Sequence, residues 1–187
     1  MESLIKSVIG LAATAFLSVG CQSNIYHIKG EAKDFADGTK LYMTAEMDSM
    51  HRTLDTITVN NGKFRYEGET DSVVLCRLYC PKVPETALLF FIEPGNLYIE
   101  LSKVAGLSRV SGTKVNNEWQ ALNDTVAKYD EQLRTLFHPK DSISPRKVYS
   151  ETDRIYTTLT RRITETAARN RDNALGRFIN TKKPATY

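Results

Sequence analysis

Apolar and polar residues alternate in short runs through residues 25–111, and this pattern predicts β-strands. Alternation of this kind places every second side chain on the same face of an extended chain. Tyr26 and Ile28 share one face of the first run, and Leu41 and Met43 share one face of the second. We expect separate strands at residues 25–32, 39–45, 72–80, 97–101 and 108–111.

Residues 53–68 are expected to form a β-hairpin around the turn Asn60-Asn61-Gly62. Asn and Gly adopt positive φ at low cost, which a tight hairpin turn requires. Apolar residues alternate with polar ones on both sides of this turn, so they can share one buried face. The four apolar side chains are Ile57, Val59, Phe64 and Tyr66.

Residues 86–92 are apolar without alternation, which indicates a central strand that is covered on both faces. Pro81 and Pro84 are expected to end the preceding strand. The total is seven or eight short strands at close spacing. The fold class expected for residues 21–113 is therefore an antiparallel β-sandwich or a partly open barrel.

A helical arm is expected over residues 114–187, because the apolar spacing changes to steps of three and four after Gly112. Asn116-Asn117 is predicted to cap a first helix, which starts at Glu118 and ends at His138-Pro139. Ser144-Pro145 predicts the start of a second helix that runs to about residue 168. Asn173 is expected to cap a short third helix. The stripe of the first helix comprises Trp119, Leu122, Val126, Tyr129, Leu133 and Leu136.

The first 20 residues are predicted to be a signal peptide and are excluded from the fold. Their apolar stretch is too short to span a bilayer. Leu17-Ser18-Val19-Gly20-Cys21 resembles a bacterial lipoprotein cleavage box, although its large aliphatic residue lies one position further from the cysteine than usual. An acylated Cys21 would anchor the protein to a membrane, on the periplasmic side of the envelope. Ordinary secretion with a free Cys21 is the alternative.

Charge is uneven along the chain. The net charge is +3, and residues 140–187 contain eleven Lys or Arg residues and five Asp or Glu residues. A basic segment of this kind can face an anionic membrane, but a solvated helix face is the simpler interpretation. We expect no nucleic-acid partner.

Few residues suggest chemistry. Cys76 and Cys80 lie four apart on one strand, about 13 Å in an extended chain, which is too far for a disulfide. They are interpreted as buried apolar side chains. His27, His51 and His138 lack metal-ligand spacing. Asp55 and Asp71 are expected to cap turns or to remain solvated. No catalytic, cofactor-binding or metal-binding residue is predicted, and the protein is not expected to be an enzyme.

Several short motifs recur here in one order, and together they resemble a known family. They are Tyr26-His27-Ile28-Lys29-Gly30, Asp55-Thr56, residues 59–64, residues 93–96 and residues 110–118. The resemblance, over about residues 25–179, is to an uncharacterised lipoprotein domain of Bacteroidetes envelopes. That domain usually precedes a thioredoxin-like domain of the peroxiredoxin or thiol-disulfide interchange type. This sequence has no Cys-x-x-Cys pair and ends at Tyr187.

Five Asp-Ser/Thr-apolar triplets also resemble the O-glycosylation signal of envelope proteins in those bacteria. Only Ser49 and Ser142, in predicted loops, are expected to be modified.

Two functions follow from these observations. The first is a non-catalytic envelope lipoprotein that binds another envelope component or forms a homodimer through its helical arm. The second is the accessory domain of a membrane-anchored thiol-disulfide oxidoreductase whose redox domain is missing, so the chain is either a stand-alone member or a truncation. Binding of a small ligand inside a barrel is a third hypothesis.

Overall fold

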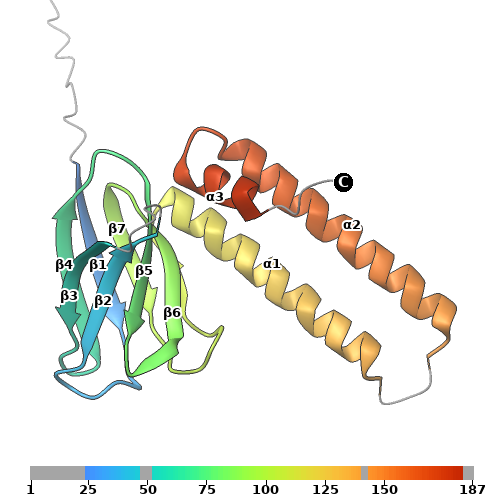
Figure 1. Ribbon diagram of the computed structural model, residues 1–187, viewed down its shortest axis with the longest axis horizontal. Helices are drawn as coiled ribbons and strands as arrows, with labels where there is room; N and C mark the ends of the chain where they lie inside the picture. The colour runs from blue at the N-terminus through green and yellow to red at the C-terminus, as the bar shows by residue number, and fades with distance from the viewer. Residues whose placement is uncertain (1–23, 47–51, 140–142, 183–187) are drawn as a thin grey trace, which may run out of the picture.

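The computed structural model describes residues 24–46, 52–139 and 143–182. Cys21, Ser49, His51 and Ser142 lie outside these residues. A two-sheet β-sandwich is followed by three helices that extend away from it (Figure 1). The strands are β1 (Ile25–Glu31), β2 (Lys40–Ala45), β3 (Arg52–Thr58), β4 (Lys63–Glu69), β5 (Val74–Cys80), β6 (Val83–Ile92), β7 (Gly95–Glu100) and β8 (Arg109–Ser111).

The two sheets have the strand orders β4-β1-β7-β8 and β3-β2-β5-β6. All strand pairs are antiparallel except β1 with β7, which run parallel. The predicted sandwich is therefore confirmed, and the described strands do not close into the alternative barrel. Alternation explains its core, because the inward residues of both sheets form one buried cluster that includes Ile28, Leu41 and Phe90.

The predicted hairpin at residues 53–68 is wrong in its pairing, although its turn is correct. Asn61 and Gly62 have φ values of 49° and 66°, as a tight reversal needs. Beyond the single bridge between Asn60 and Lys63, however, β3 pairs with β2 and β4 pairs with β1. The turn therefore carries the chain from one sheet to the other. Ile57, Val59 and Phe64 still point into the shared core.

The apolar run at residues 86–92 is covered on both faces, as predicted, but it is not a central strand. It belongs to β6, which lies at the edge of its sheet. Pro84 does not end a strand; it lies inside β6, where an edge strand tolerates a missing N–H donor. Phe90 faces the sandwich core, and Phe91 faces a second apolar cluster that the helices complete.

Two glycines in β1 and β4 are covered by aromatic rings from the opposite strand. Gly30 pairs with Phe64 and Gly68 pairs with Tyr26. A Cβ atom on Gly30 would lie 2.0 Å from the ring of Phe64, and one on Gly68 would lie 2.5 Å from the Tyr26 hydroxyl. The absence of a side chain at both positions lets each ring lie directly on the backbone of its neighbour.

The helices are α1 (Lys114–Phe137), α2 (Pro145–Arg169) and α3 (Ala174–Lys182). The second begins after Ser144 with Pro145 at its first position, as predicted. The first begins four residues earlier than predicted, after Thr113. Asn116 is therefore not a cap; it is fully buried in the first turn and bonds to β6. None of the described helices is long and apolar enough to cross a bilayer.

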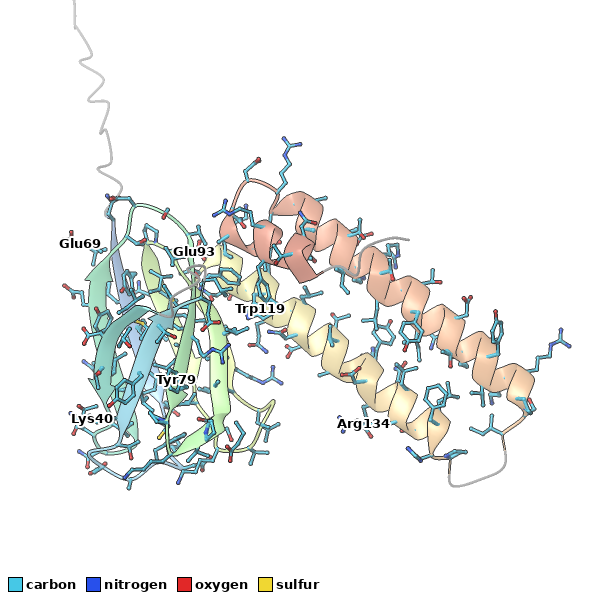
Figure 2. All side chains as sticks on the ribbon, in the orientation of Figure 1. Lys40, Glu69, Tyr79, Glu93, Trp119 and Arg134 are labelled. Atoms are coloured by element: carbon cyan, nitrogen blue, oxygen red, sulfur yellow. The ribbon has the colours of Figure 1, made fainter. Side chains whose placement is uncertain are left out.

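The first turns of α1 close the sandwich along the edges of β6 and β8. The Asn116 amide accepts a hydrogen bond from the Phe91 N–H at 2.8 Å and donates one to the Phe91 carbonyl at 2.6 Å. Trp119 Nε1 donates to the Leu89 carbonyl at 2.8 Å, and Figure 2 shows this residue beside the sandwich. The Val110 N–H of β8 donates to Gln120 Oε1. Helix α1 thus satisfies backbone groups that edge strands leave open.

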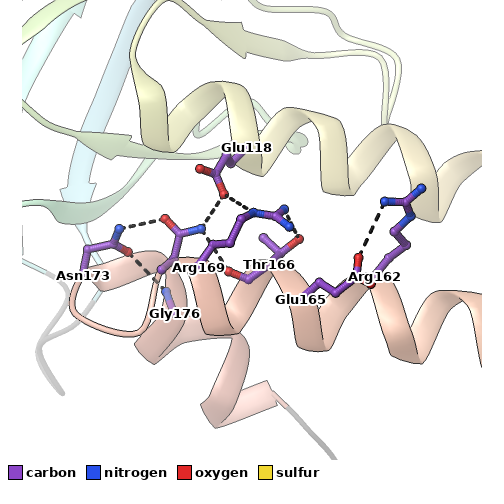
Figure 3. Close-up of polar contacts among 8 residues, drawn as sticks. Glu118, Arg162, Glu165, Thr166, Arg169, Asn173 and Gly176 are labelled. Carbon is purple, nitrogen blue, oxygen red and sulfur yellow. Dashed lines mark hydrogen bonds and ion pairs between the residues drawn. The ribbon is translucent and has the colours of Figure 1, made fainter.

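The helices α2 and α3 pack onto the same junction. Leu175 and Ile179 of α3 join Leu75, Phe91 and Leu122 in the second apolar cluster. Polar contacts fix the corner between the three helices (Figure 3). Glu118 accepts a hydrogen bond from Asn170 Nδ2 at 2.6 Å, and Asn173 Oδ1 accepts one from the Leu175 N–H at 2.9 Å. Asn173 caps α3, as the sequence predicted.

Candidate functional site

An open groove of about 560 Å³ lies on the outer face of the β4-β1-β7-β8 sheet. We call it the outer groove; its central residues are Arg65, Lys29, Tyr98, Arg109 and Asp124. Lys29 of β1 lies opposite Arg65 of β4 on one side and opposite Tyr98 of β7 on the other. These three side chains point outward because their neighbours along each strand are buried in the core.

Helix α1 forms the wall of the outer groove beside β8. Asp124 makes an ion pair with Arg109, and Gln120 Nε2 donates a hydrogen bond to the same carboxylate at 2.9 Å. Partial burial opposes ionisation of Asp124, but the hydrogen bonds from Arg109 and Gln120 outweigh it and lower the pKa of this carboxyl. Arg109 is therefore held in place by an acidic partner.

Lys29 and Arg65 have no such partner. Among the described residues, no ion pair includes either side chain, although both are exposed. The acidic residues of the two neighbouring cross-strand rows lie with other partners. Glu31 pairs with Lys33, Glu67 contacts His27, and Glu100 lies opposite Arg109. Two cations thus stand side by side next to Tyr98, whose ring is 48% exposed.

A second exposed feature lies on the outward side of α2. Tyr149 and Tyr156 are 77% and 56% exposed, and they lie two helical turns apart. With Thr160 and Thr164 they form an exposed strip along the helix, which also includes Asp153 and which we call the α2 strip. Further along this side, Ala167 is buried where α3 packs against α2. This side of α2 is therefore covered by α3 at its C-terminal end and exposed along the α2 strip.

The two described cysteines lie in the core. Cys76 and Cys80 are free thiols that are 0% and 3% exposed, as the sequence predicted. Burial, followed by the nearby charge of Glu46, raises the pKa of Cys76 to about 12. A thiol with so high a pKa is a poor nucleophile, so Cys76 is suited to packing rather than to redox chemistry.

The described histidines and acidic residues do not converge. His27 Nδ1 contacts Glu67 at 3.0 Å on the outer face of β1 and β4, and His138 ends α1. Asp55 accepts a hydrogen bond from the Thr56 N–H, and Asp71 accepts one from Asn24. Within the described ranges, no group of three or more His, Cys, Asp or Glu residues is placed to bind a metal ion.

Sequence reasoning missed the outer groove. Its residues come from four strands and from α1, and each looks like an ordinary solvated position in its own strand. The parallel pairing of β1 with β7 brings Lys29 beside Tyr98, and the sequence contains no local signal for that pairing. The alternation does correctly place Lys29 and Arg65 on outward faces, which is the only part of this site that it could predict.

Comparison with known proteins identifies one family. The sequence profile of a domain of unknown function (DUF4369) matches residues 26–119, about half of the chain. The match starts in β1 and ends at Trp119, so it includes all eight strands and the first turns of α1 that close the sandwich. No curated protein matches the chain.

Proposed function

The chain belongs to the DUF4369 family of domains of unknown function, and from this premise we propose that it is a non-catalytic accessory protein of the cell envelope. Its role is to bind other molecules while a lipid on Cys21 holds it at a membrane. Support for the anchor comes from the apolar leader and from the cleavage box that ends at Cys21. The periplasmic side is favoured.

The α2 strip is the single observation that carries the binding role. Two tyrosine side chains are exposed to solvent on a helix whose opposite side buries Ile155 against α1. Exposed aromatic residues are enriched at protein interfaces, because they bury large areas at a low cost in conformational entropy. We infer that a second copy of this chain covers the strip.

Charge favours a second copy as the partner. Helix α2 has more basic than acidic residues, whereas α1 has slightly more acidic than basic residues. In a two-fold symmetric pair, the α2 helix of one copy can lie along the α1 helix of the other with opposite charges facing each other. The arm of one copy, which has one basic helix and one slightly acidic helix, is therefore complementary in charge to the arm of a second copy.

The oligomeric state of the full chain tests this role. We expect a concentration-dependent dimer by analytical ultracentrifugation and at least tenfold weaker association for Tyr149→Ser with Tyr156→Ser, because aromatic anchors dominate interfaces. These side chains are largely exposed, so the variant should fold normally. Tyr98→Ser, on the sandwich, is the matched control and should dimerise normally. A monomer at all concentrations, or equal loss in the control, would contradict a dimer through the strip.

The intact mass of the protein purified from bacterial membranes tests the anchor. A mass that corresponds to residues 21–187 plus acyl chains supports the lipoprotein, and Cys21→Ala should then move it to the soluble fraction. Additional sugar-sized steps that disappear in Ser49→Ala or Ser142→Ala would identify glycosylation. A mass larger than the sequence allows would instead favour the alternative function, the accessory domain of a thiol-disulfide oxidoreductase.

A further inference from the structure

We propose that the outer groove binds a carboxylate-bearing saccharide, with Lys29 and Arg65 holding the carboxylate and Tyr98 packing against the sugar ring. This site is independent of the α2 strip, because it lies on the sandwich rather than on the arm. Binding in the outer groove and dimerisation through the α2 strip can therefore be tested separately.

The adjacent cations are the first argument. Lys29 and Arg65 are directly opposite each other in the β1–β4 ladder, where strands are about 4.8 Å apart. Like charges at such positions destabilise a sheet, and no described acidic side chain pairs with either one. A carboxylate bound between them would remove this repulsion and could accept charge-assisted hydrogen bonds from both.

The tyrosine is the second argument. Tyr98 lies on β7, on the other side of Lys29 from Arg65, and 48% of its side chain is exposed. Its ring therefore presents a flat apolar surface on the same face as both cations, one strand from Lys29 and two strands, about 10 Å between Cα atoms, from Arg65. The carbon–hydrogen face of a sugar ring packs well on such a surface, and a uronic acid places its carboxylate at the edge of the same ring.

The strand pairing favours a saccharide over a peptide. β1 pairs on both sides, with β4 and β7, and β7 pairs with β1 and β8. The centre of the groove, at Lys29 and Tyr98, thus offers no open strand edge to which an extended peptide could add; the edge strands of this sheet are β4 and β8. The groove instead has side chains that can pair with hydroxyl groups. Glu31, Glu100 and Ser111 lie beside the cations. These carboxylates and this hydroxyl can accept hydrogen bonds from sugar hydroxyl groups.

Calorimetric titration of the full chain tests the site, with oligogalacturonate as the probe and a neutral oligosaccharide of equal length as its comparison. We expect binding of the acidic sugar only, and much weaker binding in about 1 M NaCl, where the screening length is about 3 Å. Arg65→Gln and Lys29→Gln should each weaken binding about tenfold or more, and Tyr98→Ala about threefold or more.

Matched variants separate binding from folding. Arg65→Gln should keep or raise the melting temperature of the free protein, because it removes repulsion, while it weakens binding. Lys82→Gln, a lysine in the β5–β6 turn, and Phe137→Ser, an exposed aromatic residue at the end of α1, should bind normally. Equal binding of the neutral sugar, loss of affinity in the controls, or no binding at all would overturn the proposal. Poly-L-glutamate that binds as tightly and does not need Tyr98 would overturn it in favour of an acidic peptide.

Discussion

At the scale of single residues, the interior of the sandwich depends on groups that must stay neutral. Cys76 is fully buried, and its thiol has a pKa of about 12 compared with 9.0 when unperturbed, chiefly because of burial. Burial and the nearby hydroxyl of Tyr66 likewise raise the pKa of Tyr26. Both groups therefore keep their protons in the folded protein at pH values where the unfolded chain loses them.

This difference predicts a loss of stability in alkali. Because the folded pKa of Cys76 is raised, its contribution is complete below pH 9 and is lost as the pH rises towards 12. The free energy of unfolding should fall with a slope that approaches about 1.4 kcal/mol per pH unit for this one group. Urea denaturation between pH 8 and pH 9.5 measures the slope, below the unperturbed pKa of 10.0 at which Tyr26 ionises in the unfolded chain.

A cysteine variant and a second core variant of β5 show whether Cys76 causes this pH dependence. Cys76→Ala should flatten the pH dependence between pH 8 and pH 9.5, whatever it does to the absolute stability. Leu78→Ala destabilises the same strand without removing a titratable group and should leave the slope as it is in the parent. An unchanged slope in Cys76→Ala would show that the thiol does not stay protonated in the folded state.

At the scale of elements, the edges of the sandwich explain why α1 begins where it does. The Phe91 N–H and C=O point away from the sheet at the β6 edge, and Asn116 bonds to both. Thr113 Oγ1 accepts a further hydrogen bond from the same amide at 2.7 Å. The Glu93 carboxylate accepts a hydrogen bond from the Val115 N–H at 2.8 Å, which satisfies one of the free donors of the helix start.

Asn116→Ala is therefore expected to destabilise the protein by about 2–4 kcal/mol. It leaves two buried backbone groups of β6 without partners, each of which costs about 1–3 kcal/mol. Asn117→Ala is the matched control, since Asn117 is exposed and accepts one hydrogen bond, from the Gly112 N–H. It should cost about 1 kcal/mol or less. Urea midpoints compare the two, and equal losses would mean that Asn116 acts only as a local cap.

The faces of the elements could be read from the sequence, but their neighbours could not. Alternation correctly predicted that Ile57, Val59 and Phe64 are buried, because a period of two fixes the face of a strand. It could not show that β3 and β4 separate after their turn, because pairing is decided by β1 and β2 elsewhere in the chain. Asn116 was misread as a cap for the same reason, since its partner lies 25 residues away.

The outer groove shows the same limit. Lys29, Arg65 and Tyr98 lie far apart in the sequence, and only the register of β4, β1 and β7 brings them together. Gly30 belongs to a stretch that carries the family resemblance, and the structure explains it by the Phe64 ring that lies on its backbone.

At the scale of the whole molecule, the junction between sandwich and arm holds the three helices to the sheets. Trp119 lies between Phe91 of β6 and Phe178 of α3, with ring centroids 6.0 and 5.6 Å away. Leu175 is fully buried in the same cluster. Further along the arm, α1 and α2 contact only each other, as Figure 1 shows, and their stripe residues such as Leu133 are half-buried.

This arrangement predicts that the molecule has one cooperative junction and a less stable distal arm. Leu175→Ala should lower the free energy of unfolding by about 2–5 kcal/mol, because it creates a cavity where helix and sheet meet. Leu133→Ala makes the same chemical change in the distal arm and should leave the main transition almost unmoved, because that region can open locally. Trp119 is the only tryptophan of the chain, so its fluorescence reports the junction directly.

Hydrogen exchange completes the comparison, because it resolves where each variant opens. Leu133→Ala should increase amide exchange in the distal turns of α1 and α2 while β5 and β6 stay protected. Leu175→Ala should increase exchange in α3, in the first turns of α1 and in the β6 strand together, since one cluster joins them. If both variants shifted the Trp119 transition equally, the arm and the sandwich would unfold as a single unit. The α2 strip would then be presented on a rigid support rather than on an arm that can open locally.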